Sequence, residues 1–187
     1  MAEVRLGEDA GRPVLLVDGT VQSVLEDDPS GYWSLMVPDV RPRRALLLGL
    51  GGGTIARLLH ARFGDVPTVG VDEDGDIVAF AHELLRDLPG LEIVQGDAFA
   101  YVAEAAARGD HFDYIAIDLY RGDSMPHGIV GKTFLRGLRT LLEPRGLAVF
   151  NLFFERRVDD RVRRIGRILE VTDRRVVGKN LVLWCRA

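Results

Sequence analysis

The chain has 187 residues, of which 47% are hydrophobic and 28% charged, and this composition predicts one globular core rather than disorder. Its formal net charge of -4 gives no general attraction to nucleic acids or anionic membranes. A single cysteine, Cys185, excludes an internal disulfide, and the four histidines lack metal-ligand spacing, so we expect no metal site. Residues 1–10 do not resemble a signal peptide and no segment reaches the ~18 apolar residues of a membrane span, so we expect a cytoplasmic protein.

The first segments of the chain predict a β-hairpin. Asp18-Gly19-Thr20 is a turn signal between apolar runs at 13–17 and 21–25. Strand-like and helix-like segments then alternate from residue 41 onwards. We therefore expect a hairpin segment at 1–40 and one Rossmann-like domain at 41–187. The expected strands are 45–49, 67–72, 91–95, 113–118 and 147–153, and the expected helices are 53–63, 75–86, 98–108, 131–142 and 156–169.

This alternation predicts an α/β protein with a mostly parallel sheet that is covered by helices on both faces. The last two apolar segments, 175–177 and 181–184, flank Gly178-Lys179-Asn180 and predict a second hairpin. An antiparallel strand is therefore expected at or near one edge of the sheet.

The most informative motif is a glycine-rich turn between a strand and a helix. Apolar residues 45–48 run directly into Gly49-Leu50-Gly51-Gly52-Gly53-Thr54. This order brings backbone close to a ligand and points the N–H groups of a helix N-terminus at it. Asp72 ends the next strand, where an acid can bind both hydroxyls of a ribose. Together they predict a nucleotide-like ligand; the alternative is a plain tight turn, with Asp72 capping the next helix.

Further acidic residues follow the later strands. Asp97 can accept a hydrogen bond from an adenine amino group while Ala98 lies against the ring, and the alternative is that Asp97 only caps the next helix. Asp118 ends a fully apolar strand, and the alternative is a solvated strand end. Asp123 lies in the loop at 119–127, which has the composition of a loop over the edge of the sheet.

From about Val14 to Trp184 the chain resembles the spermidine synthase-like branch of the class I, S-adenosylmethionine-dependent methyltransferase fold. The resemblance is carried by the glycine turn and by segments 17–22, 70–74, 96–98, 117–126 and 150–152. It implies a seven-stranded sheet. It also implies a nucleoside cofactor site formed by Gln22, Gly49, Gly51, Gly53, Asp72, Glu73, Asp97 and Ala98.

The resemblance also implies an acceptor site. Asp118 would lie beside the transferred group, where it is the candidate general base or amine-orienting residue. Tyr32 matches part of a sequence that helps to hold a polyamine, and Asp123 lies near the place of a second acid. Tyr120 is a candidate for stacking on the substrate, with a lid over the core as the alternative.

Departures from the family pattern concern the choice of cofactor. Aminopropyltransferases usually have an acid in the glycine turn, near the amine of decarboxylated S-adenosylmethionine, where this chain has Gly52. Losing that carboxylate removes a discrimination against ordinary S-adenosylmethionine. We therefore expect ordinary S-adenosylmethionine to bind at least as tightly, and Gly52→Asp to reverse the order. Arg121 also replaces the family's second aspartate.

These observations favour methyl transfer from S-adenosylmethionine to an amine or another small nucleophile. Aminopropyl transfer from decarboxylated S-adenosylmethionine to a di- or polyamine and a non-catalytic nucleoside-binding remnant remain as alternatives. The expected partner is a small-molecule amine, without nucleic acid or membrane, and a homodimer stays open. In the basic segment 155–187, the apolar stripe of Val158, Val162, Ile165 and Leu169 indicates a solvated amphipathic helix rather than an RNA-binding surface.

Overall fold

A seven-stranded sheet forms the centre of the computed structural model, which describes residues 4–17, 19–25, 31–120 and 124–187. Neighbouring strands are parallel from β6 to β8, and β10 runs antiparallel to both of its neighbours. The predicted α/β fold and the antiparallel strand near one edge are therefore confirmed. In spatial order the strands are β6 (Leu91–Gln95), β5 (Thr68–Asp72), β4 (Ala45–Leu48), β7 (Phe112–Ile117), β8 (Leu142–Phe153), β10 (Asn180–Arg186) and β9 (Glu170–Val177).

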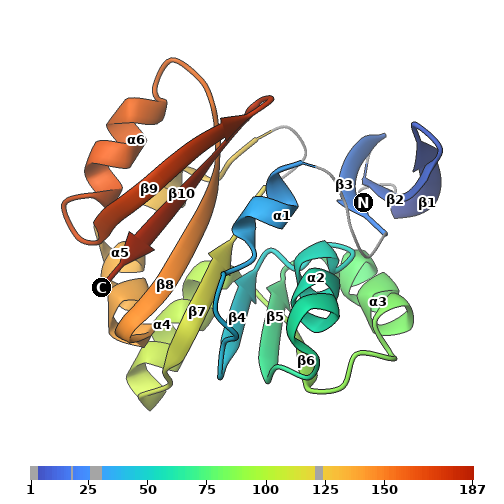
Figure 1. Cartoon of the computed structure of the whole chain (residues 1–187), viewed down its shortest axis with the longest axis horizontal. Coiled ribbons are helices and arrows are strands. Elements are labelled where there is room, and N and C mark those ends of the chain that lie inside the picture. Colours follow the sequence, from blue (N-terminus) through green and yellow to red (C-terminus); the bar gives the residue numbers. More distant parts are fainter. Residues whose placement is uncertain (1–3, 18, 26–30, 121–123) are drawn as a thin grey trace.

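Helices cover both faces of this sheet, as Figure 1 shows. The central strand β4 is buried along its whole length, as expected for a parallel strand between two helical layers. One layer contains α1 (Tyr32–Met36), α2 (Thr54–Phe63) and α3 (Gly75–Leu84). The other layer contains α4 (Ala98–Arg108), the 3-10 helix η1 (His127–Val130), α5 (Lys132–Leu141) and α6 (Val158–Ile165).

The N-terminal residues form a separate antiparallel sheet of three strands, β1 (Val4–Asp9), β2 (Arg12–Val17) and β3 (Thr20–Val24). The predicted hairpin corresponds to β2 and β3. The sequence did not predict β1, which is mostly exposed and lacks an apolar run. It also did not predict α1, because a helix of five residues depends on tertiary packing. Here that packing includes a hydrogen bond from the Tyr114 hydroxyl to the Met36 carbonyl (2.6 Å).

Three predicted boundaries in the C-terminal half are wrong. β8 begins at Leu142 rather than 147, α6 ends at Ile165 rather than 169, and β9 begins at Glu170 rather than 175. β9 is an edge strand whose residues are mostly exposed, so its sequence lacks an apolar pattern and its extent follows from pairing with β10. Among the described residues, no helix is long and apolar enough to cross a membrane.

The carboxyl ends of the central strands lie in direct contact. The Asp118 N–H donates to the Leu48 carbonyl (2.9 Å), and the Gly49 N–H donates to the Val71 carbonyl (2.9 Å). Gly49 has a φ of 85°, and a Cβ at this position would lie 2.2 Å from the Asp118 carbonyl oxygen. Only glycine fits here, and the fit holds the start of the glycine turn against Asp118.

Candidate active site

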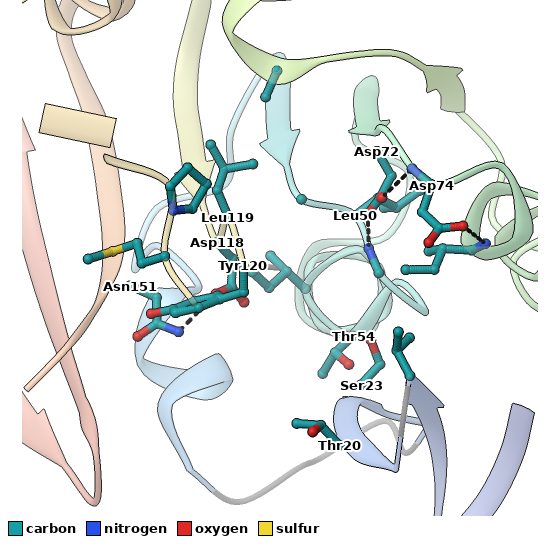
Figure 2. A pocket seen from close by; sticks show the side chains of 18 of the residues that line it. Thr20, Ser23, Leu50, Thr54, Asp72, Asp74, Asp118, Leu119, Tyr120 and Asn151 are labelled. Carbon is teal, nitrogen blue, oxygen red and sulfur yellow. Dashed lines mark hydrogen bonds between the residues drawn. The ribbon is translucent and has the colours of Figure 1, made fainter. Parts of the chain in front are cut away.

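A cavity of about 1070 Å³ lies at the carboxyl edge of the sheet. Its volume is at the upper end of the range for small-molecule sites, which leaves room for a nucleoside and a second small molecule. Figure 2 shows Asp72 and Asp74 on one side of this cavity and Asp118, Tyr120 and Asn151 on the other. The predicted site residues in its wall are Tyr32, Gly49, Gly51, Asp72, Glu73, Asp97, Ala98, Asp118 and Tyr120.

Asp72 stabilises the glycine turn from the end of β5. Its Oδ2 accepts a hydrogen bond from the Gly51 N–H (2.9 Å), and its Oδ1 accepts one from the Asp74 N–H (3.2 Å). Burial raises the pKa of this carboxyl, which the two backbone hydrogen bonds oppose. The residue that caps α3 is Asp74, which accepts from the N–H groups of Asp76 and Ile77. Asp72 therefore does not cap α3, and the alternative interpretation of this residue as a helix cap is wrong.

Asp97 does cap the next helix. Its Oδ1 accepts a hydrogen bond from the Ala100 N–H (2.8 Å) at the start of α4. The same residue lies in the cavity wall between Gly96 and Ala98. The capping interpretation is thus correct, and contact with an adenine stays a prediction.

Three other predicted residues have different outcomes. Gly53 is the N-cap of α2 with a φ of 83°, and a Cβ there would lie 2.3 Å from Leu85 Cδ1, so Gly53 faces α3. Gln22 belongs to β3, but its side chain is outside the described part of the structure, as is Asp123. Within the described ranges, no three histidine, cysteine or acidic side chains are grouped so that they could hold a metal ion.

Side chains from two other elements orient the Asp118 carboxylate. The Tyr32 hydroxyl, on α1, donates to Oδ2 (3.1 Å), and the Asn151 amide, on β8, donates to Oδ1 (2.8 Å). Tyr32 is 86 residues and Asn151 33 residues from Asp118 in the sequence. The alternative of a solvated strand end is therefore wrong.

Burial makes Asp118 a suitable proton acceptor. It raises the pKa of the Asp118 carboxyl to about 6, against the opposing effect of the two hydrogen bonds. Burial and the neighbouring carboxylate raise the pKa of Tyr32 well above its ordinary value, so Tyr32 remains a donor. At neutral pH Asp118 is mostly ionised, yet its pKa is close enough to the working pH for efficient proton transfer.

Comparison with curated proteins gives relatives that are named as polyamine aminopropyltransferases. No family model matches the chain. It is 36% identical over 105 residues to polyamine aminopropyltransferase 1 of Hyperthermus butylicus, covering 50% of this chain and 36% of the relative. It is 27% identical over 179 residues to a polyamine aminopropyltransferase of Neisseria meningitidis, covering 93% of this chain and 65% of the relative. The chain thus spans between about a third and two thirds of the length of these curated relatives.

Solved structures show the same fold. A probable spermidine synthase from Corynebacterium glutamicum superposes with a TM-score of 0.78 at 18% identity, covering 99% of this chain and 77% of that one. Human methyltransferase-like protein 13, solved with SAH, gives a TM-score of 0.70 at 21% identity, covering 82% and 75%. The chain therefore has the fold that these two structures share, and its curated relatives are named as aminopropyltransferases. The resemblance stated from its motifs is confirmed.

The sequence analysis missed Asn151. Its side chain is fully buried, lines the cavity and leaves Oδ1 without a hydrogen-bond partner among the described residues. The Tyr120 hydroxyl is likewise buried and unpartnered within that part of the chain, while its ring packs on Phe153 at 4.6 Å. An asparagine inside the otherwise apolar run 147–153 was the available signal, because a buried amide needs a polar partner.

Proposed function

We propose that the chain is a transferase that moves an aminopropyl group from decarboxylated S-adenosylmethionine to a di- or polyamine. The single observation that carries this proposal is the Asp118 carboxylate, which Tyr32 and Asn151 orient in the cavity that also contains Asp72 and Asp97. A protein that only binds a nucleoside has no need of a second oriented carboxylate across the cavity from Asp72.

The comparisons change the order of the two candidate reactions. The sequence put methyl transfer first, because Gly52 replaces an acid in the glycine turn. Both curated relatives are named as aminopropyltransferases instead, which supports aminopropyl transfer better than methyl transfer. We therefore take aminopropyl transfer as the proposed reaction. Methyl transfer is the second candidate, and analysis of the thioether product distinguishes the two.

The residues of the site suggest how this chain would assist the reaction. When bound, the sulfonium cofactor supplies an alkyl carbon that an amine can attack, with a neutral thioether as the leaving group. Asp118 would orient the amine and take its proton on a carboxylate oxygen as the new C–N bond forms and the C–S bond breaks. Tyr32 and Asn151 hold that carboxylate in place. Tyr120 and Phe153 provide an aromatic wall that helps to exclude water.

The identity of the thioether product tests the proposal. The protein is incubated with either sulfonium cofactor and a panel of di- and polyamines, small amines and hydroxyl compounds. Aminopropyl transfer from decarboxylated S-adenosylmethionine releases methylthioadenosine, whereas methyl transfer from S-adenosylmethionine releases S-adenosylhomocysteine. We expect methylthioadenosine with a di- or polyamine. Folded protein that gives no calorimetric signal with either cofactor or either thioether would contradict the whole assignment.

A further inference from the structure

Strand β3 covers the fourth residue of the glycine turn. The Gly52 N–H donates to Ser23 Oγ (2.7 Å). A Cβ on Gly52 would lie 2.9 Å from Ser23 Cβ and 3.2 Å from Leu25 Cδ2, so any side chain here must displace β3. Gly52→Asp is therefore a poor test of cofactor choice, because the substitution disturbs the packing of β3 before it adds a carboxylate to the cavity.

Two buried hydroxyl side chains lie on this side of the cavity. Ser23 and Thr54 are each 2% exposed and line the cavity. The Thr54 hydroxyl donates to the Val24 carbonyl (2.9 Å), which fixes the start of α2 against β3. Figure 2 shows Ser23 and Thr54 close together, on the side of the cavity near β3 and apart from both Asp72 and Asp118. Next to Gly52 this wall therefore presents the uncharged hydroxyl of Ser23 together with apolar carbon atoms of Ser23 and Leu25.

The proposed function would bring the cofactor to this wall. A nucleoside held at Asp72 and Asp97 with its sulfur toward Asp118 would have its three-carbon tail near the glycine turn and β3, which line the same cavity. A carboxylate there would attract the amine of the decarboxylated cofactor and repel the carboxylate of the ordinary one. A serine hydroxyl carries no net charge and discriminates weakly.

We propose that Ser23 of β3 determines which sulfonium nucleoside this site binds, and that its neutral hydroxyl admits the carboxylated and the decarboxylated forms alike. This inference rests on the proposed function, since it concerns the cofactor of that reaction. It assigns the choice of cofactor to the N-terminal sheet rather than to the glycine turn.

Calorimetry with S-adenosylmethionine and decarboxylated S-adenosylmethionine tests this role. The two dissociation constants of the wild type should lie within tenfold of each other. Ser23→Asp should change their ratio by tenfold or more in favour of the decarboxylated compound. Ser23→Asn is the neutral control of similar size and should keep the wild-type ratio. Ser34→Asp adds the same charge at an exposed position on α1 and should also keep it.

Other outcomes are equally informative. A wild type that already prefers one compound by tenfold or more overturns the inference, and so do equal ratios for Ser23→Asp and Ser23→Asn. Thermal melting shows which variants are folded. If Ser23→Asp does not fold, the ratio of the two wild-type dissociation constants is the remaining test of the inference. Folded wild type that binds neither compound contradicts the proposed function itself, which separates that failure from a failure of the Ser23 proposal.

Discussion

The two sides of the cavity are constructed differently. On the side proposed for the cofactor, Asp72 and Asp97 accept hydrogen bonds from backbone N–H groups of a turn and a helix start. On the side proposed for the acceptor, Asp118 is held by the side chains of Tyr32 and Asn151, which come from two other elements. The first pair of carboxylates thus depends on nearby backbone, whereas Asp118 depends on side chains that only the tertiary structure brings together. We therefore expect substitution of Asp72 to change cofactor affinity and substitution of Asp118 to change turnover.

Asp118→Asn should have the largest effect. It keeps the size of the side chain but removes its charge and basicity, so turnover should fall by ~100-fold or more while cofactor affinity stays within a few fold. Thioether release and calorimetry measure the two effects. Asp113→Asn is the matched control at the other end of β7, where Asp113 accepts from the N–H groups of Arg43 and Arg44, and it should leave turnover unchanged. Parallel loss of cofactor binding would instead place Asp118 on the cofactor side.

Asp72→Ala should have the opposite pattern. Losing a charge-assisted contact with the ribose and the bond to Gly51 should weaken binding of cofactor or thioether by roughly 1.5 to 3 kcal/mol, or roughly 10- to 150-fold. Calorimetry measures this directly. Asp113→Ala also removes a carboxylate that accepts backbone hydrogen bonds, but away from the cavity, so it should lower the melting temperature without changing affinity. Unchanged affinity in Asp72→Ala would refute the cofactor assignment of this residue.

Tyr32→Phe should act through Asp118. The Tyr32 hydroxyl donates to Asp118 and lowers its pKa, so removing it should raise that pKa above about 6. The midpoint of the kcat/KM profile should move to higher pH, with a several-fold loss of turnover below pH 6 and unchanged cofactor affinity. Tyr101→Phe, on α4 beside Arg108, is the control. A profile with an unmoved midpoint would remove Tyr32 from the acceptor side.

The smallest expected effect is on stability. The pKa of Asp118 is about 6 in the folded protein, above its ordinary value of 3.8. Between these values the folded state retains a proton that the unfolded state loses, so this carboxyl contributes less stability as the pH rises, and the loss is complete above about 6. The unfolding free energy of wild type minus that of Asp118→Asn should therefore fall between pH 4 and 7 in denaturant titrations. A difference that rises with pH would show that Asp118 is stabilised as an anion.

Particular residues show how far the sequence could predict the site. Asp118 was found because it follows a fully apolar strand, and parallel strands place their carboxyl ends at one edge. Asn151 was not assigned a role, although it lies within the segment that carried the resemblance. Its partner is 33 residues away, and no spacing rule connects them. The start of β9 was also missed, because pairing with β10 rather than an apolar pattern determines it.

The sequence by itself determined the alternation of strands and helices from β4 onwards, the glycine turn and the acids at the strand ends. These features depend on periodicity and on contacts between residues close in the chain. Only the tertiary structure decided that Tyr32 and Asn151 orient Asp118 and that Ser23 covers Gly52. Those contacts join residues 86, 33 and 29 positions apart, and they form because the sheet edge and β3 bring separate elements against one cavity.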